Sequence, residues 1–599
     1  MKFQEFAKLL QELENLSSRN EMVVVLAEFL QKLSEEEIQP VMYMMKGRIV
    51  PGFIPIEFNF STKLLLKALE KGFDNSMDEL NKELASLGDI GSVAEVVSTS
   101  AKTPKSGLKI QEVYERLMEL ANLEGTGSQE AKQQVFVELT KALDPISTKY
   151  VARIITGKMR LGMSDKTVLD ALSWVLTGDK SKRELLDMAY GVRSDLGLIA
   201  KLVLAGKEKK LESLKVQPGI PVASKLVERE KSPEAVFERL GECLSQPKYD
   251  GLRTQIHFSK KGFDAVGSSK QKQNGNHMMD LGVQAQNNVR IFSRNMEPLT
   301  DMFPDIVEEM SKYDVDSAVL DAEAIGYDPK TGKFFPFQET IKRKRKYGVG
   351  KKAKQVPVKV FVFDILQING KDVTTEHIQE RIKILDKLVK ENGSSIIVKS
   401  ETDLIKSAKG LESGLKEALD DGLEGIIAKD VQSQYVPGTR NYDWIKLKAN
   451  IYDDLVDSID CVVLGYYYGE GARAKFGAGA FLVGVYNKKK DRFESIAKVG
   501  SGIKDDELKG YVEQVDALRV DELPKNVKIK KELMPDVLCR PEIVVVVDAD
   551  EISKSKLHTA GAKKDGRGFS LRFPRLKEWG RVDKEAEGVT SVEEIAGMR

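Results

Sequence analysis

The chain has 599 residues, which is too long for a single small module, and 41% of them are hydrophobic while 31% are charged. This composition is near that of ordinary globular proteins and excludes the collagen-like, disulfide-scaffold and disordered classes. Because 93 Lys plus Arg face 92 Asp plus Glu, the formal net charge is +1. Any affinity for nucleic acid therefore has to come from local basic surfaces.

Cysteine and histidine usage narrows the compartment and the chemistry. Cys243, Cys461 and Cys539 lie far apart and form no C-x-x-C pair, which excludes a zinc ribbon and favours a reducing compartment. No apolar run approaches the roughly 18 residues of a membrane span, and the first residues, MKFQEFAKLLQELENL, do not resemble a signal peptide. We therefore expect an intracellular protein of the cytoplasm or nucleoid, without membrane association. With only four histidines, catalysis is expected to use Lys, Arg and carboxylates.

Three zones follow one another along the chain. Residues 1–213 repeat apolar side chains at three- and four-residue spacing, as in MVVVLAEFLQKL, which predicts an all-α domain. The prolines and glycine of VQPGIPVAS indicate a linker over 214–229. Residues 230–448 alternate strand-like runs such as VKVFVFDIL with helical runs, which predicts an α+β domain. Residues 449–599 carry runs such as EIVVVVDADEI and predict a small all-β domain.

The segment Lys248-Tyr249-Asp250-Gly251-Leu252-Arg253 precedes the strand-like TQIHF, so we expect Lys248 in a loop that leads into a sheet. The pattern K-x-D-G is a weak signal by itself, because short motifs need structural context. A plain turn explains the same letters, since Asp-Gly is a common turn pair and lysine is usually a solvated surface residue. The meaning of the segment depends on the rest of the chain.

Further motifs follow in order over roughly 340 residues, and the ordered set is specific. They are Ser293-Arg294, Asp321-Ala322-Glu323, Phe363 in VFVFDIL, Glu424-Gly425 with Lys429, Arg440 in YVPGTRNYDW, Lys446-x-Lys448, and Arg572-Phe573-Pro574-Arg575. Headed by Lys248, this set resembles the nucleotidyl-transferase signature of ATP-dependent DNA ligases. The helical segment KYVARIITGKMRLGMSDKTVLDAL is similar to the family's DNA-binding domain, so the resemblance covers almost the whole chain and points to the archaeal and eukaryotic replicative type.

The resemblance implies a fold and a role for each motif. It implies a helical DNA-binding domain at 1–213, an adenylation (nucleotidyl-transferase) domain at 230–448 and an OB-fold domain at 449–599. Lys248 would be the adenylated lysine, and Phe363 would stack on the adenine. The residues implied to bind the nucleotide are Gln246, Arg253, Arg294, Glu323, Phe363, Arg440 and Lys446. Further contacts to phosphate or AMP are implied for Lys429, Lys448, Arg572 and Arg575.

These residue types suit the joining of phosphate ends. Lysine is a nucleophile only as the free amine, and its reference pKa of about 10.4 keeps it protonated at neutral pH unless its neighbours favour deprotonation. Clustered cations disfavour the charged amine and neutralise triphosphate oxygens. Glu323 and Glu424 are candidate ligands of Mg²⁺ or another divalent ion, and Glu323 alternatively binds the ribose hydroxyls.

Plainer interpretations stay open at several of these positions when they are taken singly. Phe363 lies in an apolar run that is typical of a buried strand. Lys446 and Lys448 fit the solvent face of an alternating strand. Asp321 and Glu323 share a face at i and i+2, which also fits an exposed strand edge. The joint order of the motifs favours the catalytic interpretation over these alternatives.

The helical zone offers a candidate contact to the DNA backbone. Ser164 is expected to cap a helix whose free N–H groups point toward Gly162, with Lys158 and Arg160 nearby. Such contacts fix position without reading bases. An ordinary capped helix with solvated lysines is the alternative. The basic run at 342–354 fits either a DNA-contacting loop or a solvated one, and the long connection at 259–290 has no assigned role.

Two positions depart from the family pattern. The family usually has Glu two residues before the nucleophile, where it hydrogen-bonds the adenine amine, whereas this chain has Gln246. Because glutamine donates as well as accepts, strict preference for ATP is open. In the expected hinge after Lys448, Asn450 stands where the family commonly has Asp.

We therefore predict a DNA ligase that seals nicks in double-stranded DNA through a lysyl-AMP intermediate, with ATP and Mg²⁺, in replication, repair and recombination. The alternatives are an RNA ligase or capping-type nucleotidyl transferase, a NAD-dependent ligase, which the missing cysteine site disfavours, and a non-catalytic DNA-binding scaffold. By resemblance a sliding clamp (PCNA) is an expected partner, although no clear clamp-binding box occurs. We expect a monomer.

Overall fold

The structure is a computed structural model, and it describes residues 1–599 except 17, 100–106, 264–287, 336, 344–352, 354, 449–457, 470–472, 474–475, 564, 582–583 and 599. It divides into two compact units, Met1–Ile451 and Tyr452–Arg599, each with its own hydrophobic clusters. Three segments lie wholly or mostly outside the described residues: Asn450 in the expected hinge, the 259–290 connection and the basic run at 342–354.

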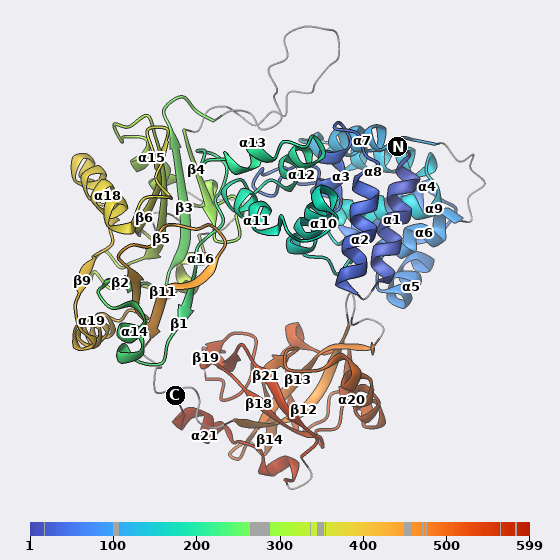
Figure 1. Ribbon diagram of the computed structural model, residues 1–599. Coiled ribbons are helices and arrows are strands. Elements are labelled where there is room, and N and C mark those ends of the chain that lie inside the picture. The colour runs from blue at the N-terminus through green and yellow to red at the C-terminus, as the bar shows by residue number, and fades with distance from the viewer. Residues whose placement is uncertain are drawn as a thin grey trace. The chain divides into compact units, whose positions relative to one another are not determined.

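The first unit begins with an all-α region (Figure 1). Its helices are α1 (Phe3–Asn15), α2 (Arg19–Leu30), α3 (Ile38–Met44), α4 (Thr62–Gly72), α5 (Met77–Leu87), α6 (Ile90–Thr99), α7 (Ile110–Asn122), α8 (Ser128–Lys141), α9 (Pro145–Thr156), α10 (Asp165–Thr177), α11 (Arg183–Val192), α12 (Leu196–Leu204) and α13 (Glu208–Glu212). Together they form the helical domain.

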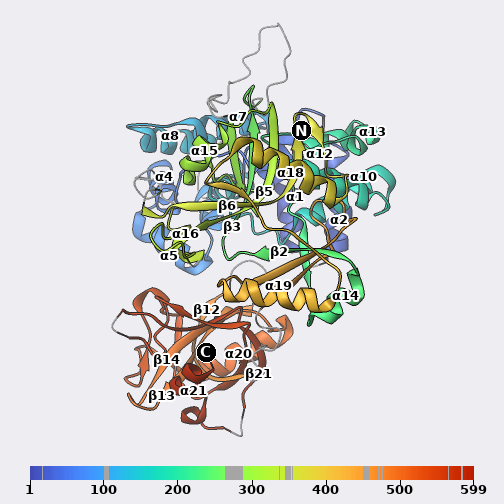
Figure 2. The ribbon, with the colours of Figure 1, turned by 90° about the vertical axis from the view of Figure 1, so that its left-hand side faces the viewer.

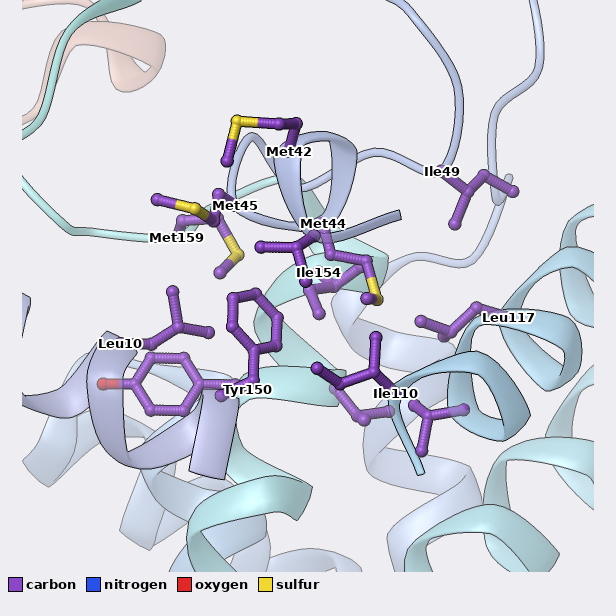
Figure 3. Close-up of a cluster of buried hydrophobic side chains, with 14 of the residues drawn as sticks. Leu10, Met42, Met44, Met45, Ile49, Ile110, Leu117, Tyr150, Ile154 and Met159 are labelled. Atoms are coloured by element: carbon purple, nitrogen blue, oxygen red, sulfur yellow. The ribbon is translucent and has the colours of Figure 1, made fainter. Parts of the chain in front are cut away.

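Local signals explain where these helices begin and end. Asp144 accepts a hydrogen bond from the Ser147 N–H at the start of α9, and Gly157 ends that helix in the left-handed conformation. The predicted cap at Ser164 is confirmed, because its side chain accepts from the Thr167 N–H. The apolar faces meet in one core, where methionines from α3 lie beside isoleucine and leucine side chains and Tyr150 (Figure 3).

The rest of the first unit contains two sheets with helices packed against them. The first sheet has the order β1 (Leu226–Arg229), β11 (Arg440–Lys448), β10 (Gly425–Asp430), β2 (Cys243–Lys248) and β9 (Asp403–Ile405). The second has the order β4 (Val289–Ser293), β3 (Leu252–Ser259), β5 (Ser317–Gly326), β6 (Val358–Ile368) and β7 (Lys371–Asp372), and β8 (Ile397–Lys399) pairs with β6. The helices are α14 (Pro233–Leu240), α15 (Pro304–Met310), α16 (Phe337–Ile341), α18 (Ile378–Asn392) and α19 (Ala408–Asp420).

Each sheet has a helical cover. Helices α14 and α19 pack against each other and against the first sheet, while α18 packs on β6 and β8 (Figure 2). Residues 226–229, which fall in the predicted linker, form β1 and pair with β11, so the chain joins the first sheet before 230. The sequence pattern missed this strand because it is short and its neighbouring prolines and glycine indicate a turn.

The second unit is β-rich. Its main sheet contains β12 (Ile459–Tyr468), β13 (Ala478–Asn487), β14 (Arg492–Val499), β15 (Arg519–Val520), β16 (Val527–Lys528), β17 (Val537–Cys539), β18 (Val544–Asp548) and β21 (Arg575–Trp579). A second sheet pairs β19 (Glu551–Ser555) with β20 (Gly568–Arg572), and the described residues also form the helices α20 (Asp505–Ala517) and α21 (Val592–Gly597). The predicted succession of all-α, α+β and β-rich regions is confirmed. Among the described residues no helix is both long and apolar enough to cross a membrane.

Candidate active site

Strand pairing brings the predicted lysines to one face of the first sheet. Lys248 lies opposite Gly425, and Gly425 lies opposite Lys448 on the other side of β10. Residues directly opposite each other in an antiparallel pair share a face, and so do residues two apart on one strand. By the same register Gln246, Lys429, Trp444 and Lys446 belong to the face of Lys248. The alternating lysines of β11 thus line the same surface as the candidate nucleophile.

Two glycines in the motifs are explained by close approach. A Cβ on Gly251 would lie 2.7 Å from the Ala324 carbonyl oxygen and 2.9 Å from Cγ of Glu323. Gly425 has φ +142°, and a Cβ there would lie 2.1 Å from the Leu447 carbonyl oxygen. Both positions exclude a side chain, and the second also needs a backbone conformation that favours glycine. The glycines therefore allow Glu323 to approach the turn after β2 and allow β11 to approach β10.

The amine of Lys248 is held by an ion pair with Glu424. The same carboxylate oxygen, Oε2, lies 2.9 Å from Nζ of Lys448. The backbone N–H of Glu424 donates to the Lys248 carbonyl oxygen at 3.0 Å, which fixes the start of β10 beside the end of β2. Burial raises the pKa of Glu424, but the two lysines outweigh this effect and hold it well below its usual range.

Glu323 supplies a second carboxylate near Lys248. It lies on β5 opposite Arg253, and burial raises its pKa to about 7 although Lys248 and Arg253 act in the opposite direction. Glu323 is therefore not a solvated strand edge, which was the plainer interpretation of the sequence. Its neighbour at i−2, Asp321, is fully buried and pairs with Arg253 through two contacts of 2.6 and 3.0 Å.

Cations surround the ring of Phe363. The guanidinium carbon of Arg253 lies 5.3 Å from the ring centroid, and Nζ of Lys429 lies 5.0 Å from it. Lys429 is 1% exposed, its Nζ also lies 3.8 Å from the Trp444 ring, and burial lowers its pKa to about 7. Phe363 itself is half-buried, so it does not have the enclosed position of an ordinary core residue.

Gln246 presents an acceptor without a partner among the described residues. Its amide nitrogen donates to the Phe363 carbonyl oxygen at 3.3 Å and to Oγ1 of Thr402 at 3.0 Å. The Thr402 hydroxyl donates to the Ser400 carbonyl oxygen, so it accepts from Gln246. Both neighbours are acceptors, which fixes the orientation of the amide. Its Oε1 is buried and, within the part of the chain that the structure describes, has no hydrogen-bond partner.

A second group of cations adds positive charge near Arg253 and Lys248. Burial, followed by the nearby charges of Arg253 and Arg440, lowers the pKa of Arg294. Burial also lowers the pKa of Lys446, and Lys448, Lys248 and Arg440 reinforce the shift. These shifts indicate mutual repulsion among cations in one region. Such an arrangement favours a polyanionic ligand, because each negative charge that enters relieves the repulsion.

The comparisons with known proteins agree with the motif order. Three family models match: DNA ligase N terminus at 2–173, ATP dependent DNA ligase domain at 268–448, and ATP dependent DNA ligase C terminal region at 474–584. The chain is 40% identical over 600 residues to a probable DNA ligase of Dictyoglomus thermophilum, with 100% of this chain and 97% of that protein covered. The chain belongs to the ATP-dependent DNA ligase family.

A DNA ligase of Sulfolobus acidocaldarius is 33% identical to this ligase over 615 residues, with 100% of this chain and 98% of that protein covered. A solved structure titled Pmar-Lig_PreS3 covers 96% of this chain and 99% of its own at 16% identity and a TM-score of 0.51, which supports the fold. The matched middle domain begins at 268, after Lys248, so the model match does not include that lysine.

Members of this family seal nicks in DNA through an adenylate intermediate and use ATP with a divalent metal, typically Mg²⁺. The residues of this ligase fit both ATP and a divalent metal ion. The unpartnered Oε1 of Gln246 can accept from the adenine amine. Among the described residues no group of three or more His, Cys, Asp or Glu side chains could hold a metal. Glu323 and Glu424 fit Mg²⁺, which commonly binds one or two carboxylates together with waters and substrate phosphates.

Four predicted residues belong to other parts of the chain than the strands of this face. In the helical domain, Arg160 has φ +58° and donates to the Gly88 carbonyl oxygen at 2.6 Å, while Lys158 is exposed near the end of α9. In the second unit, Arg575 pairs with Asp550 at 2.8 Å and Arg572 with Glu551 at 3.2 Å.

Sequence reasoning missed the polar residues beneath the face. The Tyr435 hydroxyl donates to Asp321 at 2.8 Å, and the Lys225 carbonyl oxygen accepts from Arg253 at 3.1 Å. Nζ of Lys225 contacts Oδ2 of Asp443 at 3.0 Å. The position of Trp444 on this face could have been predicted from the sequence, because Trp444 alternates with Lys446 and Lys448 on one strand. Lys225 and Tyr435 carry no local signal of this kind, since they act through long-range contacts.

Proposed function

We propose that Lys248 is the residue that becomes adenylated. Its amine nitrogen attacks the α-phosphorus of ATP, a nitrogen–phosphorus bond forms, the bond to pyrophosphate breaks, and an amine proton is released. The AMP then passes to the 5′-phosphate of the nick, and the 3′-hydroxyl attacks that phosphorus and displaces AMP. The observation that carries this proposal is the placement of two carboxylates and several cations around the Lys248 amine.

The nucleotide is proposed to lie against the face of the first sheet that carries Lys248, beside Glu323 and Phe363 of the second sheet. Phe363 stacks on the adenine, and Gln246 accepts from its amine. Arg253 is held by Asp321 and contacts the ribose or the phosphates. Five further cations of the site contact the phosphates with it, namely Arg294, Lys429, Arg440, Lys446 and Lys448. The geometry supports this assignment because aromatic faces stack on bases while arginine forks and lysines bind phosphate oxygens.

Glu323 and Glu424 are the proposed ligands of the divalent ion, and Glu323 alternatively binds the ribose. When bound, Mg²⁺ supplies positive charge that neutralises phosphate oxygens as negative charge develops on them. Glu424 also orients Lys248, because its carboxylate engages the amine. Lys448 contacts the same carboxylate oxygen and limits how far Glu424 can move.

The remaining assignments extend beyond this face. Arg572 and Arg575 are proposed to contact the triphosphate during adenylation, and Lys158 and Arg160 to contact the DNA backbone. We place the ligase inside the cell, as a monomer, in DNA replication, repair and recombination, with nicked DNA as substrate and a sliding clamp as a partner. The family membership supports the DNA substrate, whereas the clamp and the monomeric state rest on resemblance.

One experiment tests the core of the proposal. The full chain is incubated with ATP and Mg²⁺, and its mass is measured before and after. We expect an increment of one AMP that is absent in Lys248→Ala. Lys399→Ala is a matched control, because Lys399 lies on β8 of the second sheet and pairs with Asp386 at 2.9 Å, and it should retain the adduct. If active protein forms no adduct, or Lys248→Ala still carries it, the assignment is wrong. Nicked DNA and nicked RNA offered in parallel then separate a DNA ligase from an RNA ligase.

A further inference from the structure

The helical domain reaches into the segment that carries Arg294. Phe292 on β4 is 1% exposed and belongs to the hydrophobic core of the helical domain. Its ring lies edge-on to that of Phe53, with centroids 6.4 Å apart. Arg294 follows Phe292 by two residues, so the depth at which Phe292 sits in the helical core sets where the end of β4 presents Arg294.

A second contact reaches the segment that carries Arg440. Helix α11 lies on the side of the helical domain nearest the sheets (Figure 1), and Gly191 lies near its end. A Cβ on Gly191 would lie 2.9 Å from Cβ of Pro437 and 3.1 Å from its carbonyl oxygen. Pro437 precedes Arg440 by three residues, in the turn before β11. The absence of a side chain at Gly191 therefore sets how closely α11 approaches this turn.

Hydrogen bonds fix the same approach. The Ala223 N–H donates to the Gly191 carbonyl oxygen at 2.8 Å, and the Ala223 carbonyl oxygen accepts from the Gly438 N–H at 3.3 Å. The next residue of α11, Val192, is buried in one apolar cluster with Tyr435 and Trp444, and Phe363 packs against that cluster. The end of α11 is thus connected both to the turn before Arg440 and to the support of the nucleotide face.

We propose that the helical domain positions Arg294 and Arg440 for the nucleotide, and that Gly191 is the positioning residue through which it acts on Arg440. Lysine adenylation in the absence of DNA then depends on the contact between α11 and the turn at Pro437. This inference rests on the proposed function, because it takes Arg440 to contact the nucleotide.

The test is Gly191→Ala in the full chain. Gly191 lies within a helix and has no left-handed φ, so alanine suits the helix itself while its methyl group displaces the Pro437 turn. We expect the KM for ATP in DNA-free adenylation to rise about tenfold, because small misplacements of binding groups have effects of this order. Gly510→Ala is the matched control, since Gly510 lies in α20 and a Cβ there meets nothing within 4 Å.

A double mutant separates positioning from a general structural effect. If Gly191 acts through Arg440, Gly191→Ala with Arg440→Ala should have the same KM for ATP as Arg440→Ala alone. Additive effects, or an unchanged KM in Gly191→Ala when Arg440→Ala raises it, would overturn the inference and leave the role of Arg440 standing. An unchanged KM in Arg440→Ala would instead refute the proposed role of Arg440, and the inference with it. Thermal unfolding of each variant shows that the chain is folded.

Discussion

Base selection by this ligase is expected to depend on one oxygen atom of Gln246. The Gln246 amide nitrogen is occupied by two acceptors, and its Oε1 is left buried without a partner among the described residues. An adenine amine offers the donor that this oxygen lacks, whereas guanine would present a carbonyl oxygen at the same place. We therefore expect Gln246→Met, which keeps the length of the side chain and removes its polar atoms, to weaken selection for ATP over GTP.

The magnitude follows from the cost of an unmade hydrogen bond. A buried polar group that loses its partner costs about 1–3 kcal/mol. Because about 1.4 kcal/mol corresponds to a factor of ten, kcat/KM for ATP should fall by roughly 5- to 150-fold. GTP should lose much less, since the variant also removes an oxygen–oxygen repulsion. Most of the fall for ATP should therefore appear in the ratio of kcat/KM for ATP to that for GTP, which we expect to decrease several-fold or more.

The assay is the rate of AMP or GMP attachment to the full chain, measured without DNA over a range of nucleotide concentrations. Thr402→Val provides a partial perturbation, because it removes one of the two acceptors that orient the Gln246 amide. It should lower the ATP to GTP ratio by less than Gln246→Met does. If Gln246→Met retains the wild-type ratio while it binds ATP more weakly, the oxygen does not select the base and the reasoning is wrong.

Two further predictions concern the backbone at the site and the stability of the first unit. Gly425→Ala should abolish adenylation or lower its rate at least about 100-fold. A methyl group at Gly425 would lie 2.1 Å from the Leu447 carbonyl oxygen and would force β10 and β11 apart. Single-turnover rates of adenylation measure this effect. His257 is buried, and this burial, together with the smaller effect of the Arg290 charge, lowers its pKa to about 3. The folded protein therefore keeps His257 neutral at a pH where the unfolded chain, in which its pKa is near 6.5, takes up a proton. Stability should therefore fall as the pH drops below about 6.5, by about 2 kcal/mol at pH 5, and calorimetry should find this loss reduced in His257→Gln.

The elements that the sequence predicted well are those with local signals. Ser164 is a cap whose partner lies three residues away, and the lysines of β11 share a face because strand geometry alternates. By contrast, the pairing of Gly425 with Lys248 joins segments far apart in the chain, and no periodicity specifies its register. Resemblance to the family identified both segments, whereas their contact required the fold.

Buried polar contacts were the least predictable part of the site. Lysine is usually exposed, but Lys225 is fully buried. Its ammonium group can be buried because it donates hydrogen bonds to Asp443 and to the Gln434 carbonyl oxygen. The strand at 226–229 was interpreted as linker for a related reason, since its partner β11 lies more than two hundred residues later. Such residues acquire their positions from long-range partners, and the local sequence around them does not contain that information.

The low pKa of buried Lys429 has a consequence for ATP binding. Without nucleotide, burial lowers the pKa of Lys429 to about 7, so at pH 8 the amine is mostly neutral. A triphosphate near this amine favours its charged form, and binding should therefore take up close to one proton at pH 8. Titration calorimetry in two buffers of different ionisation enthalpy measures this uptake, and the Lys248→Ala background prevents adenylation during the titration. Adding Lys429→Met should remove the uptake. If the uptake persists in that double variant, another group is responsible and Lys429 does not respond to the nucleotide.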